Sequence, residues 1–503
     1  MIEPTPEKRL SNGGLVLWRI GAALLLGLYA TLLVRANSYV AGGADSSGYL
    51  NAARLLSRGR VVEPVELVTR LDLTSREARL FIPLGFVPAA GPATMAPYYP
   101  PGLPLHMASI AALGGWTHAP FLVGPLAALA ALVLFFSMGR ELGLSRTLSA
   151  AGTLLLALCP IFFGMAIQPM SDVPATAWVL AALLFGLRAR RDDRWAILCG
   201  AAFGMAVLVR PTDLLAAPAA ALALPARRGA IAKSFLAALP FAILLAAYNT
   251  TAFGSAAATG YGSALAWSLS ARNVLPEIRN YGYWIPVLLT PLLPLCWIAV
   301  VVDRRVPRRD RALLFLWFGS FFAFYCFYQV YEDWWSTRFL LPGIPAMILA
   351  TAILARDVSL ALENRNLLRG LVRRRTVIGI ALLVAILAIE VNHIRRFDLL
   401  GMARGETVYR DASRWAASSL PSGSLLVAMQ MSGALKYYTG LPIVRWDSID
   451  PGRFQALRQS LEAHGLHWYA LLWPFEETDF RKRLPGPWTR IGVWRDIGLW
   501  RLD

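Results

Sequence analysis

The residues of this chain that could take part in a reaction lie in short polar segments between long apolar runs. These segments are 43–60, 98–102, 168–174, 259–262 and 331–338. Together they supply carboxylates, arginines and tyrosines. A carboxylate can take a proton from an attacking hydroxyl, an arginine neutralises phosphate, and aromatic rings cover the faces of sugars. The combination favours chemistry on a phosphate-linked sugar.

Asp45 is the strongest catalytic candidate. It follows the first apolar run and opens a predicted amphipathic helix over 46–58, so a lipid-borne and a water-borne substrate could meet at its carboxylate. We predict that Asp45 orients or deprotonates an acceptor. The alternative is that Asp45 only caps this helix, a role that Asp fills well.

Nine further residues complete the predicted site. We predict Asp172 as a second catalytic acid and the other eight as substrate-binding residues: Arg338, Arg210, Tyr49, Tyr98, Tyr99, Glu332, Asp333 and Tyr261. Seven of the nine have a structural alternative. Asp172 could cap the next helix, with a proline in its first turn. The arginines could extend to the membrane interface, Tyr98 and Tyr99 could form an interfacial belt, and the remaining acids could lie in a solvated loop.

The composition indicates a polytopic helical membrane protein. Of 503 residues, 56% are hydrophobic and 16% are charged, and the mean hydropathy is +0.50. The net charge of +18 comes from Lys and Arg gathered between apolar runs, which indicates membrane topology and phospholipid contacts rather than nucleic acid. All four cysteines lie inside apolar runs without metal-like spacing, so we expect no disulfide and no cysteine-based metal site.

Eleven apolar runs are predicted to span the membrane: 15–34, 119–138, 147–167, 173–187, 195–209, 212–224, 234–253, 283–302, 312–331, 339–355 and 376–394. The first reads as a retained signal anchor. A further run, 102–114, is predicted to lie on the outer surface. The loops then assigned to the inner side hold twice as many Lys and Arg as the outer ones in about half as many residues. This places the N-terminus inside and the C-terminus outside.

Two of the runs, 195–209 and 212–224, are short for a span. At about 1.5 Å per residue they reach roughly 20–22 Å against a hydrocarbon core of roughly 30 Å. They could be two short spans or a re-entrant pair, joined at Arg210-Pro211-Thr212. Broken helices at membrane depth line cavities or are covered by protein, which makes Arg210 a candidate for a charge in a cavity.

Residues 395–503 differ in pattern from the rest. Predicted helices at 406–420 and 451–463 alternate with β-rich runs. The runs are 425–429, 443–446, 468–473 and 490–494. The predicted fold is therefore an all-α polytopic membrane domain, 1–394, followed by a small α/β domain, 395–503, on the outer side.

Six motifs carry a resemblance to a known family. They are Asp45…Tyr49 with Ala53-Arg54-Leu55-Leu56, Tyr99-Pro100-Pro101-Gly102-Leu103-Pro104-Leu105, Gly139-Arg140-Glu141-Leu142, Ser171-Asp172-Val173-Pro174, Val209-Arg210-Pro211-Thr212 and Arg338-Phe339-Leu340-Leu341-Pro342. In order and spacing, over about residues 15–355, they resemble GT-C membrane glycosyltransferases. The similar branch contains bacterial protein O-mannosyltransferases of the dolichyl-phosphate-mannose type and the lipid A aminoarabinose and galacturonic acid transferases.

The resemblance implies a glycosyltransferase of the bacterial cell envelope. Its donor would be a polyprenyl-phosphate sugar and its acceptor a glycolipid, lipid A, a protein or a glycan, on the periplasmic side of the inner membrane. The first-loop acid, here Asp45, would be the general base or acceptor-orienting group. Some relatives have two acids in tandem where this chain has Asp45-Ser46. A divalent metal ion, with Asp45 and Asp172 as its ligands, therefore stays an open expectation.

Two other classes of protein stay open. A transporter or flippase for lipid-linked sugar would place polar residues on discontinuous helices near mid-membrane, often in two related halves. A non-catalytic envelope scaffold would use residues 395–503 to bind partners. Against the transporter, the sequence shows one broken pair, no visible second half and polar groups gathered in the predicted outer loops. The scaffold does not account for carboxylates and arginines that recur on one predicted face of the spans.

Overall fold

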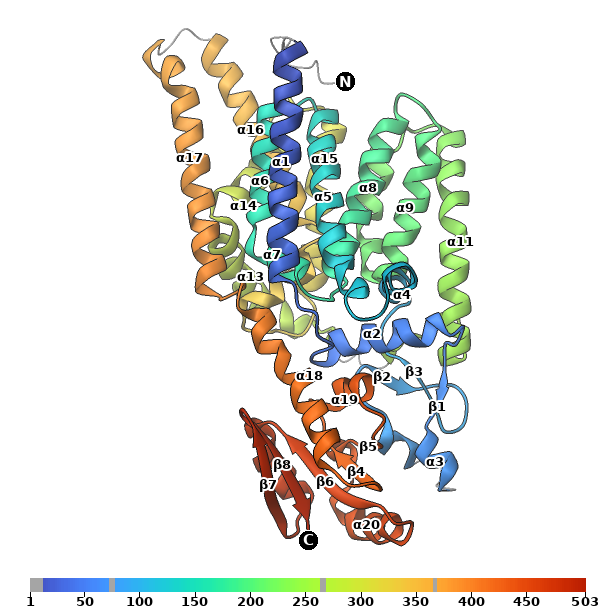
Figure 1. The fold of residues 1–503 in the computed structure, drawn as a ribbon. Coiled ribbons are helices and arrows are strands. Elements are labelled where there is room, and N and C mark those ends of the chain that lie inside the picture. Colours follow the sequence, from blue (N-terminus) through green and yellow to red (C-terminus); the bar gives the residue numbers. More distant parts are fainter. Residues whose placement is uncertain (1–11, 72–76, 263–267, 365–368) are drawn as a thin grey trace. The chain divides into compact units, whose positions relative to one another are not determined.

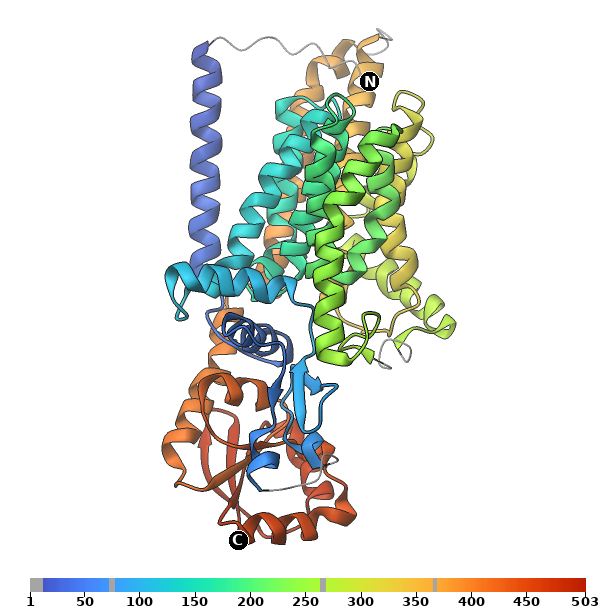
Figure 2. The same cartoon turned by 90° about the vertical axis from the view of Figure 1, so that its right-hand side faces the viewer.

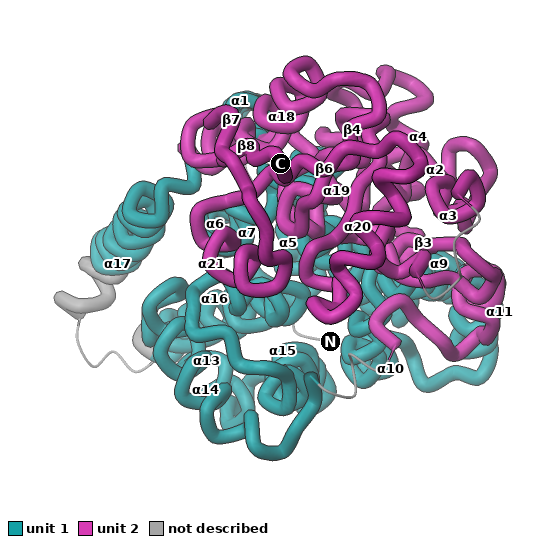
Figure 3. Tube along the Cα trace, turned by 90° about the horizontal axis from the view of Figure 1, so that it is seen from below, with its two compact units in different colours: residues 1–37, 123–243, 263–400 teal, residues 38–122, 244–262, 401–503 magenta. Residues whose placement is uncertain are grey.

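The computed structural model describes residues 12–71, 77–262, 268–364 and 369–503. They form two compact units, coloured separately in Figure 3. Unit 1 comprises 1–37, 123–243 and 263–400, and unit 2 comprises 38–122, 244–262 and 401–503. The predicted division into 1–394 and 395–503 stays a prediction.

Unit 1 is built of helices that run beside one another (Figures 1 and 2). Its helices are α1 (Asn12–Ala36), α5 (Val123–Glu141), α6 (Arg146–Leu158), α7 (Pro160–Ala166), α8 (Asp172–Ala189), α9 (Trp195–Val209), η3 (Pro211–Ala216), α10 (Ala217–Ala223), η4 (Ala271–Asn273), α13 (Val274–Leu289), α14 (Leu292–Ala299), α15 (Arg308–Tyr325), η5 (Trp334–Leu340), α16 (Ile344–Asn364) and α17 (Arg369–Arg396). A further helix, α11 (Arg228–Phe253), is divided between the two units.

Burial distinguishes central from peripheral helices in unit 1. The apolar window of α8 is 83% buried, whereas those of α1 and α17 are 6% and 22% buried. Since both helices expose many large hydrophobic side chains, namely Val, Leu and Ile, they suit contact with lipid. By length and composition, six described helices can cross a membrane, or up to eight if each bent pair is one span. The chain is therefore a multi-pass membrane protein, and the count of eleven spans stays a prediction.

Several predicted runs are bent or broken rather than straight. The run 147–167 forms α6 and α7, bent by 63° where Pro160 follows Cys159. The run 283–302 falls in α13 and α14, bent by 107°. Pro291 lies at this second break, and proline ends a helix because it lacks an N–H and clashes with the preceding turn.

The first part of unit 2 is a mixed segment. It contains α2 (Ala44–Ser57), β1 (Glu63–Pro64), α3 (Glu66–Arg70), η1 (Glu77–Phe81), β2 (Phe86–Pro88), β3 (Thr94–Pro97), α4 (Gly102–Gly114) and η2 (Ala119–Leu122). The three strands form an antiparallel sheet in the order β1-β3-β2. The predicted surface helix 102–114 is confirmed as a helix, α4, and its placement on a membrane surface stays a prediction.

The rest of unit 2 is the predicted α/β domain. Its elements are α18 (Met402–Ser419), β4 (Ser424–Val427), α19 (Ser432–Tyr438), β5 (Ile443–Val444), η6 (Trp446–Ser448), η7 (Pro451–Arg453), α20 (Phe454–Ala463), β6 (His467–Leu472), α21 (Pro474–Arg483), β7 (Trp488–Trp494) and β8 (Ile497–Leu502). They surround a five-stranded sheet in the order β5-β4-β6-β8-β7. Strands β4, β5 and β6 are parallel, whereas β8 is antiparallel to β6 and β7.

One hydrophobic core joins the two parts of unit 2. It contains Leu55, Phe81 and Met95 from the first part together with Val427 and Trp468 from the sheet. Burial of such side chains drives their association. The segment after α2 is therefore a packed part of the C-terminal domain's structure.

Candidate active site

Asp45 lies in the first turn of α2. The helix begins at Ala44, and the cap position is Gly43, which makes no side-chain cap hydrogen bond. The alternative that Asp45 is the N-cap is therefore wrong. A carboxylate in the first turn interacts favourably with the positive end of the helix dipole, and the side chain is only partly buried. Both features suit a carboxylate that has to be charged and accessible.

Four tyrosines predicted to bind substrate gather with Asp45. Tyr99 Oη donates a hydrogen bond to Asp45 Oδ1 at 2.5 Å. The ring of Tyr49 lies 4.4 Å from that of Tyr99, and Tyr98 lies 5.1 Å from Tyr99. Tyr261 then packs on Tyr98 at 4.7 Å. Segments far apart in the sequence thus build one cluster, which we call the tyrosine cluster.

A glycine allows Tyr99 to reach Asp45. A Cβ at Gly48, one turn after Asp45, would lie 2.5 Å from the Tyr99 ring, so any larger residue would displace the ring. Burial, and then the charge of Asp45, raise the pKa of Tyr99 well above its usual value. Tyr99 therefore stays protonated and acts as a hydrogen-bond donor to the carboxylate.

Helix α2 is held by the C-terminal domain through α19. Asn51 Nδ2 donates to the carbonyl oxygen of Gly433 at 3.0 Å in a buried position. Arg54 Nη1 donates to the carbonyl oxygen of Tyr437 at 2.6 Å, and its guanidinium lies 3.5 Å from the centroid of the Tyr437 ring. Such a charged hydrogen bond and cation–π contact fix the helix that carries Asp45. Nothing in the sequence pattern predicts that residues 401–503 hold the helix that carries Asp45.

The second group of predicted residues lies in unit 1. Arg210 Nη1 and Asp172 Oδ1 form an ion pair at 2.6 Å, with side chains that are 13% and 5% exposed. Arg210 occupies the extended break between α9 and η3, as expected for a charge at a broken helix. Asp172 is the first residue of α8 after the cap residue Ser171. The alternative that Asp172 is the N-cap is therefore wrong.

Asp213 is an acid that the sequence analysis missed. It is fully buried, its backbone N–H bonds to the carbonyl oxygen of Arg210 at 2.8 Å, and neither carboxyl oxygen has a hydrogen-bond partner among the described residues. A signal was present, because an acid inside a short apolar run of a membrane protein marks a functional position. Asp172, Arg210 and Asp213 form what we call the buried acid–arginine cluster.

Arg338 and Arg210 share one aromatic ring. The guanidinium of Arg338 lies 5.3 Å from the centroid of Phe339 and 5.4 Å from that of Trp335. That of Arg210 lies 5.7 Å from Phe339. Two of the residues predicted to bind phosphate are thus brought together from η5 and from the break after α9. Stacking on rings holds a guanidinium in place while its edge remains able to bind an anion.

The two remaining predicted acids lie at the start of η5. Asp333 is the N-cap of η5 and accepts a hydrogen bond from the Trp334 N–H at 2.7 Å. Glu332 is exposed. The structure therefore gives Asp333 a position as a helix cap, and the assignment of both acids to substrate binding stays a prediction.

A metal ion held by Asp45 and Asp172 stays a prediction. Within the described ranges, no three His, Cys, Asp or Glu side chains gather in a way that could hold a metal ion. Asp172 is already paired with Arg210, and Asp45 accepts from Tyr99. We assign no step to a metal.

Comparison with known proteins identifies the fold. Residues 99–253 match the family described as dolichyl-phosphate-mannose-protein mannosyltransferase. ArnT from Cupriavidus metallidurans bound to undecaprenyl phosphate is 15% identical, with a TM-score of 0.58 over 95% of this chain and 98% of that one. The chain has the GT-C fold. No curated protein sequence matches it.

Other GT-C structures are similar at comparable identity. The oligosaccharyltransferase AglB from Archaeoglobus fulgidus, in complex with an inhibitory peptide and a dolichol-phosphate, is 14% identical with a TM-score of 0.57. The match covers 92% of this chain and 70% of AglB. The arabinofuranosyltransferase AftD from Mycobacteria is 14% identical, with a TM-score of 0.55 over 96% of this chain and 40% of AftD. The predicted fold class, helical with GT-C architecture and a small C-terminal sheet, is confirmed.

Proposed function

We propose that this chain is an integral membrane glycosyltransferase that moves a sugar from a polyprenyl-phosphate donor to an acceptor on the periplasmic face of a bacterial inner membrane. The observation that carries the proposal is the half-buried carboxylate of Asp45, held by the Tyr99 hydroxyl among tyrosine rings packed at tilted and edge-on angles. This is a proton acceptor beside surfaces that suit a sugar ring. The GT-C fold, shared with ArnT bound to undecaprenyl phosphate, supports the same reading.

In the proposed reaction, the acceptor hydroxyl or amine attacks the anomeric carbon of the donor sugar. The bond between that carbon and the phosphate oxygen breaks, and the polyprenyl phosphate leaves with the electron pair. The proton of the acceptor passes to Asp45, whose orientation is fixed by Tyr99. General-base assistance of this kind typically contributes about 10²- to 10⁴-fold to a rate.

The arginines are proposed to act on the donor. Arg338, held against the Trp335 and Phe339 rings, would bind the phosphate and stabilise the charge that it gains on leaving. Arg210 is already paired with Asp172, so its proposed role is to keep the neighbouring ring and Arg338 in place and to add positive potential.

The test of the donor role compares Arg338→Ala and Arg338→Lys with wild type in nanodiscs. We expect Arg338→Ala to lower the rate of polyprenyl-phosphate release by about 10²- to 10³-fold, the usual effect of removing one charge-stabilising donor. Arg338→Lys should retain part of the rate, since it keeps the charge but loses the stacked plane. The exposed Arg279→Ala is the matched control.

Release at the wild-type rate from Arg338→Ala would show that this arginine does not bind the phosphate. Binding of polyprenyl-phosphate sugar by wild type without any release, over an adequate panel of donors, would favour the flippase.

A further inference from the structure

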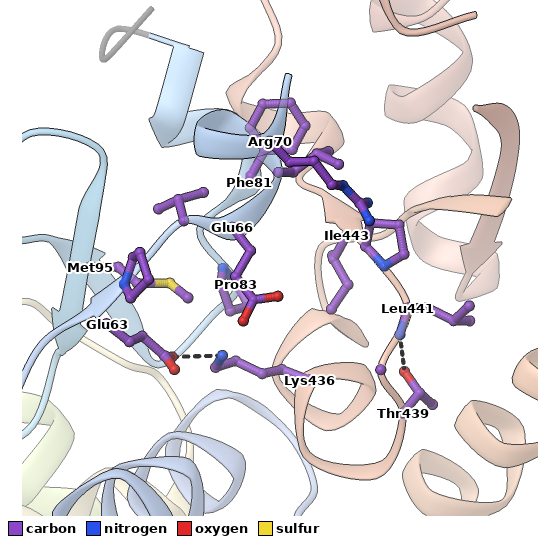
Figure 4. A pocket seen from close by; sticks show the side chains of 15 residues that line it. Glu63, Glu66, Arg70, Phe81, Pro83, Met95, Lys436, Thr439, Leu441 and Ile443 are labelled. Carbon is purple, nitrogen blue, oxygen red and sulfur yellow. Dashed lines mark hydrogen bonds and ion pairs between the residues drawn. The ribbon is translucent and has the colours of Figure 1, made fainter. Parts of the chain in front are cut away.

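A polar cavity lies in unit 2, and none of its lining residues belongs to the tyrosine cluster. It has a volume of about 260 Å³. Figure 4 shows side chains that enter it from β1 and α3 on one side and from the α19–β5 segment on the other. One side thus comes from residues 63–95 in the first part of unit 2, and the other from the C-terminal domain.

A second cavity continues the first. Its volume is about 510 Å³, and it shares Arg70, Gly440, Leu441 and Pro442 with the first cavity. Its far end is lined by residues 421–424 and 464–466. Because these four residues belong to both linings, the two cavities are adjacent. We call the two cavities together the α19–β5 groove.

The groove is polar but electrically balanced. Lys436 Nζ and Glu63 Oε1 form an ion pair at 2.6 Å, and about a fifth of each side chain is exposed. This pair is marked in Figure 4. Glu66 and Arg70 add one further charge of each sign, both exposed. The lining of the two cavities thus holds two acids, two bases of fixed charge and His464. Such a balanced set suits a neutral ligand whose groups both donate and accept hydrogen bonds.

The floor of the groove is apolar and fixed. Phe81 and Met95 line the first cavity and belong to the core that unites unit 2, and Pro83 between them in sequence is buried. A sugar ring presents a C–H face to such a floor and hydroxyls to the charged rim. The two adjacent cavities give room for more than one ring, since ligand sites typically have volumes of about 300–1,000 Å³.

We propose that the α19–β5 groove binds the saccharide part of the acceptor. The description of the ligand as an acceptor rests on the proposed function, whereas the binding of saccharide does not. The groove would then be a recognition site separate from the carboxylate, on the same unit as Asp45. It would select acceptors that carry an oligosaccharide of neutral character.

Gly440 offers a way to block the groove. A Cβ at this position would meet nothing within 4 Å, and Gly440 lines both cavities. A side chain at position 440 therefore starts in open space beside both cavities, and we expect Gly440→Trp to block the groove. Gly452 lies in the exposed 3-10 helix η7 of the same domain, where a Cβ meets only ordinary contact. Gly452→Trp is the matched control.

The experiment uses the full chain in nanodiscs on an array of neutral and amino-sugar di- to hexasaccharides, with a peptide array beside it. We expect wild type and Gly452→Trp to retain the same saccharides and Gly440→Trp to lose them. Arg70→Ala, an exposed change, should weaken binding about tenfold, the effect of one charged hydrogen bond. Polyprenyl-phosphate release by wild type is measured in parallel.

Equal saccharide binding by Gly440→Trp and wild type would overturn the proposal. So would retention of peptides instead of saccharides, or no retention of either. Donor turnover without saccharide binding would contradict the groove proposal and support the proposed function. Saccharide binding that depends on the groove, without donor turnover, would support the groove proposal and contradict the proposed function.

Discussion

Tyr99 donates its hydroxyl hydrogen to the carboxylate that we assign to catalysis. Tyr99→Phe keeps the ring against Gly48 and Tyr49 but removes this bond. A hydrogen bond to a charged group contributes about 1.5–3 kcal/mol, so we expect transfer to slow by about 10- to 100-fold. Loss of the bond also disfavours the ionised carboxylate. The acid limb of the pH–rate profile should therefore move to higher pH.

The control for this variant is Tyr283→Phe, which changes an exposed tyrosine of unit 1. A Tyr99→Phe enzyme with the wild-type rate and an unshifted acid limb would show that the bond only stabilises the fold.

At the residue scale, the sequence predicted a set of candidate residues but not the two groups in which the structure places them. Asp45 and the tyrosines, and likewise Arg210 with Arg338, were selected by type and by their place beside apolar runs. Their pairings were not predictable, because the Asp172–Arg210 ion pair joins residues on separate helices. Asp213 was missed because it lies inside the apolar run 212–224, which was interpreted as a membrane-embedded segment.

At the scale of elements, the contact between α2 and α19 decides how Asp45 is held. A Cβ at Gly433 would lie 2.1 Å from Ser47 Oγ and 3.0 Å from the carbonyl oxygen of Leu84. Overpacking of this kind typically costs about 1–3 kcal/mol. We therefore expect Gly433→Ala to lower the melting temperature and to slow transfer, as α2 is pushed away.

Ser47→Ala should restore part of both properties in the Gly433→Ala background, because it removes the atom that clashes. Gly405→Ala, where a Cβ meets nothing, should be neutral or slightly stabilising. If Gly433→Ala is fully stable and active, α19 does not fix the position of α2.

Helix α18 carries an acid whose ionisation depends on its surroundings. Burial raises the pKa of Glu406 from 4.5 to about 7. The folded state thus favours the protonated form, and the free energy of unfolding falls as pH rises from about 4.5 to about 7. Glu406→Gln should abolish this fall and stabilise the protein above about pH 7 by up to about 3 kcal/mol, since one pKa unit is worth about 1.4 kcal/mol.

Thermal unfolding at about pH 5 and about pH 8 measures this difference. Glu462→Gln, at an exposed position of α20, should leave the pH dependence unchanged. A Glu406→Gln protein that is no more stable than wild type at the higher pH would contradict the assignment.

The apolar runs predicted helices well but not their bends. Pro160 and Pro291 are evident in the sequence. A membrane helix nevertheless tolerates proline when neighbouring groups bond the freed backbone carbonyls. The bend angles of the two helix pairs therefore depended on packing, which the sequence does not show. In the C-terminal domain, the alternating patterns predicted β4 to β7. Strand β8 was missed, although it pairs with both β6 and β7.

At the scale of the whole molecule, the GT-C fold persists at 15% identity to ArnT. A hydropathy or charge pattern is kept when a residue is replaced by another of the same polarity. The fold class was therefore predictable even at this low sequence identity. The packing of Leu55, Phe81 and Met95 against the C-terminal sheet was not predictable. A core shared by residues hundreds of positions apart leaves no local sequence pattern. The C-terminal domain, predicted as a separate small α/β domain, thus helps to hold the helix that carries Asp45.

The most direct test of the account is polyprenyl-phosphate release by Asp45→Asn. Wild type, Asp45→Asn and the exposed control Asp479→Asn would be reconstituted in nanodiscs with polyprenyl-phosphate sugars and envelope lipid. We predict that Asp45→Asn inserts and folds normally but loses release by at least about 10²-fold, while Asp479→Asn matches wild type. Release by Asp45→Asn at the rate of wild type would contradict the central claim that this carboxylate carries the transfer.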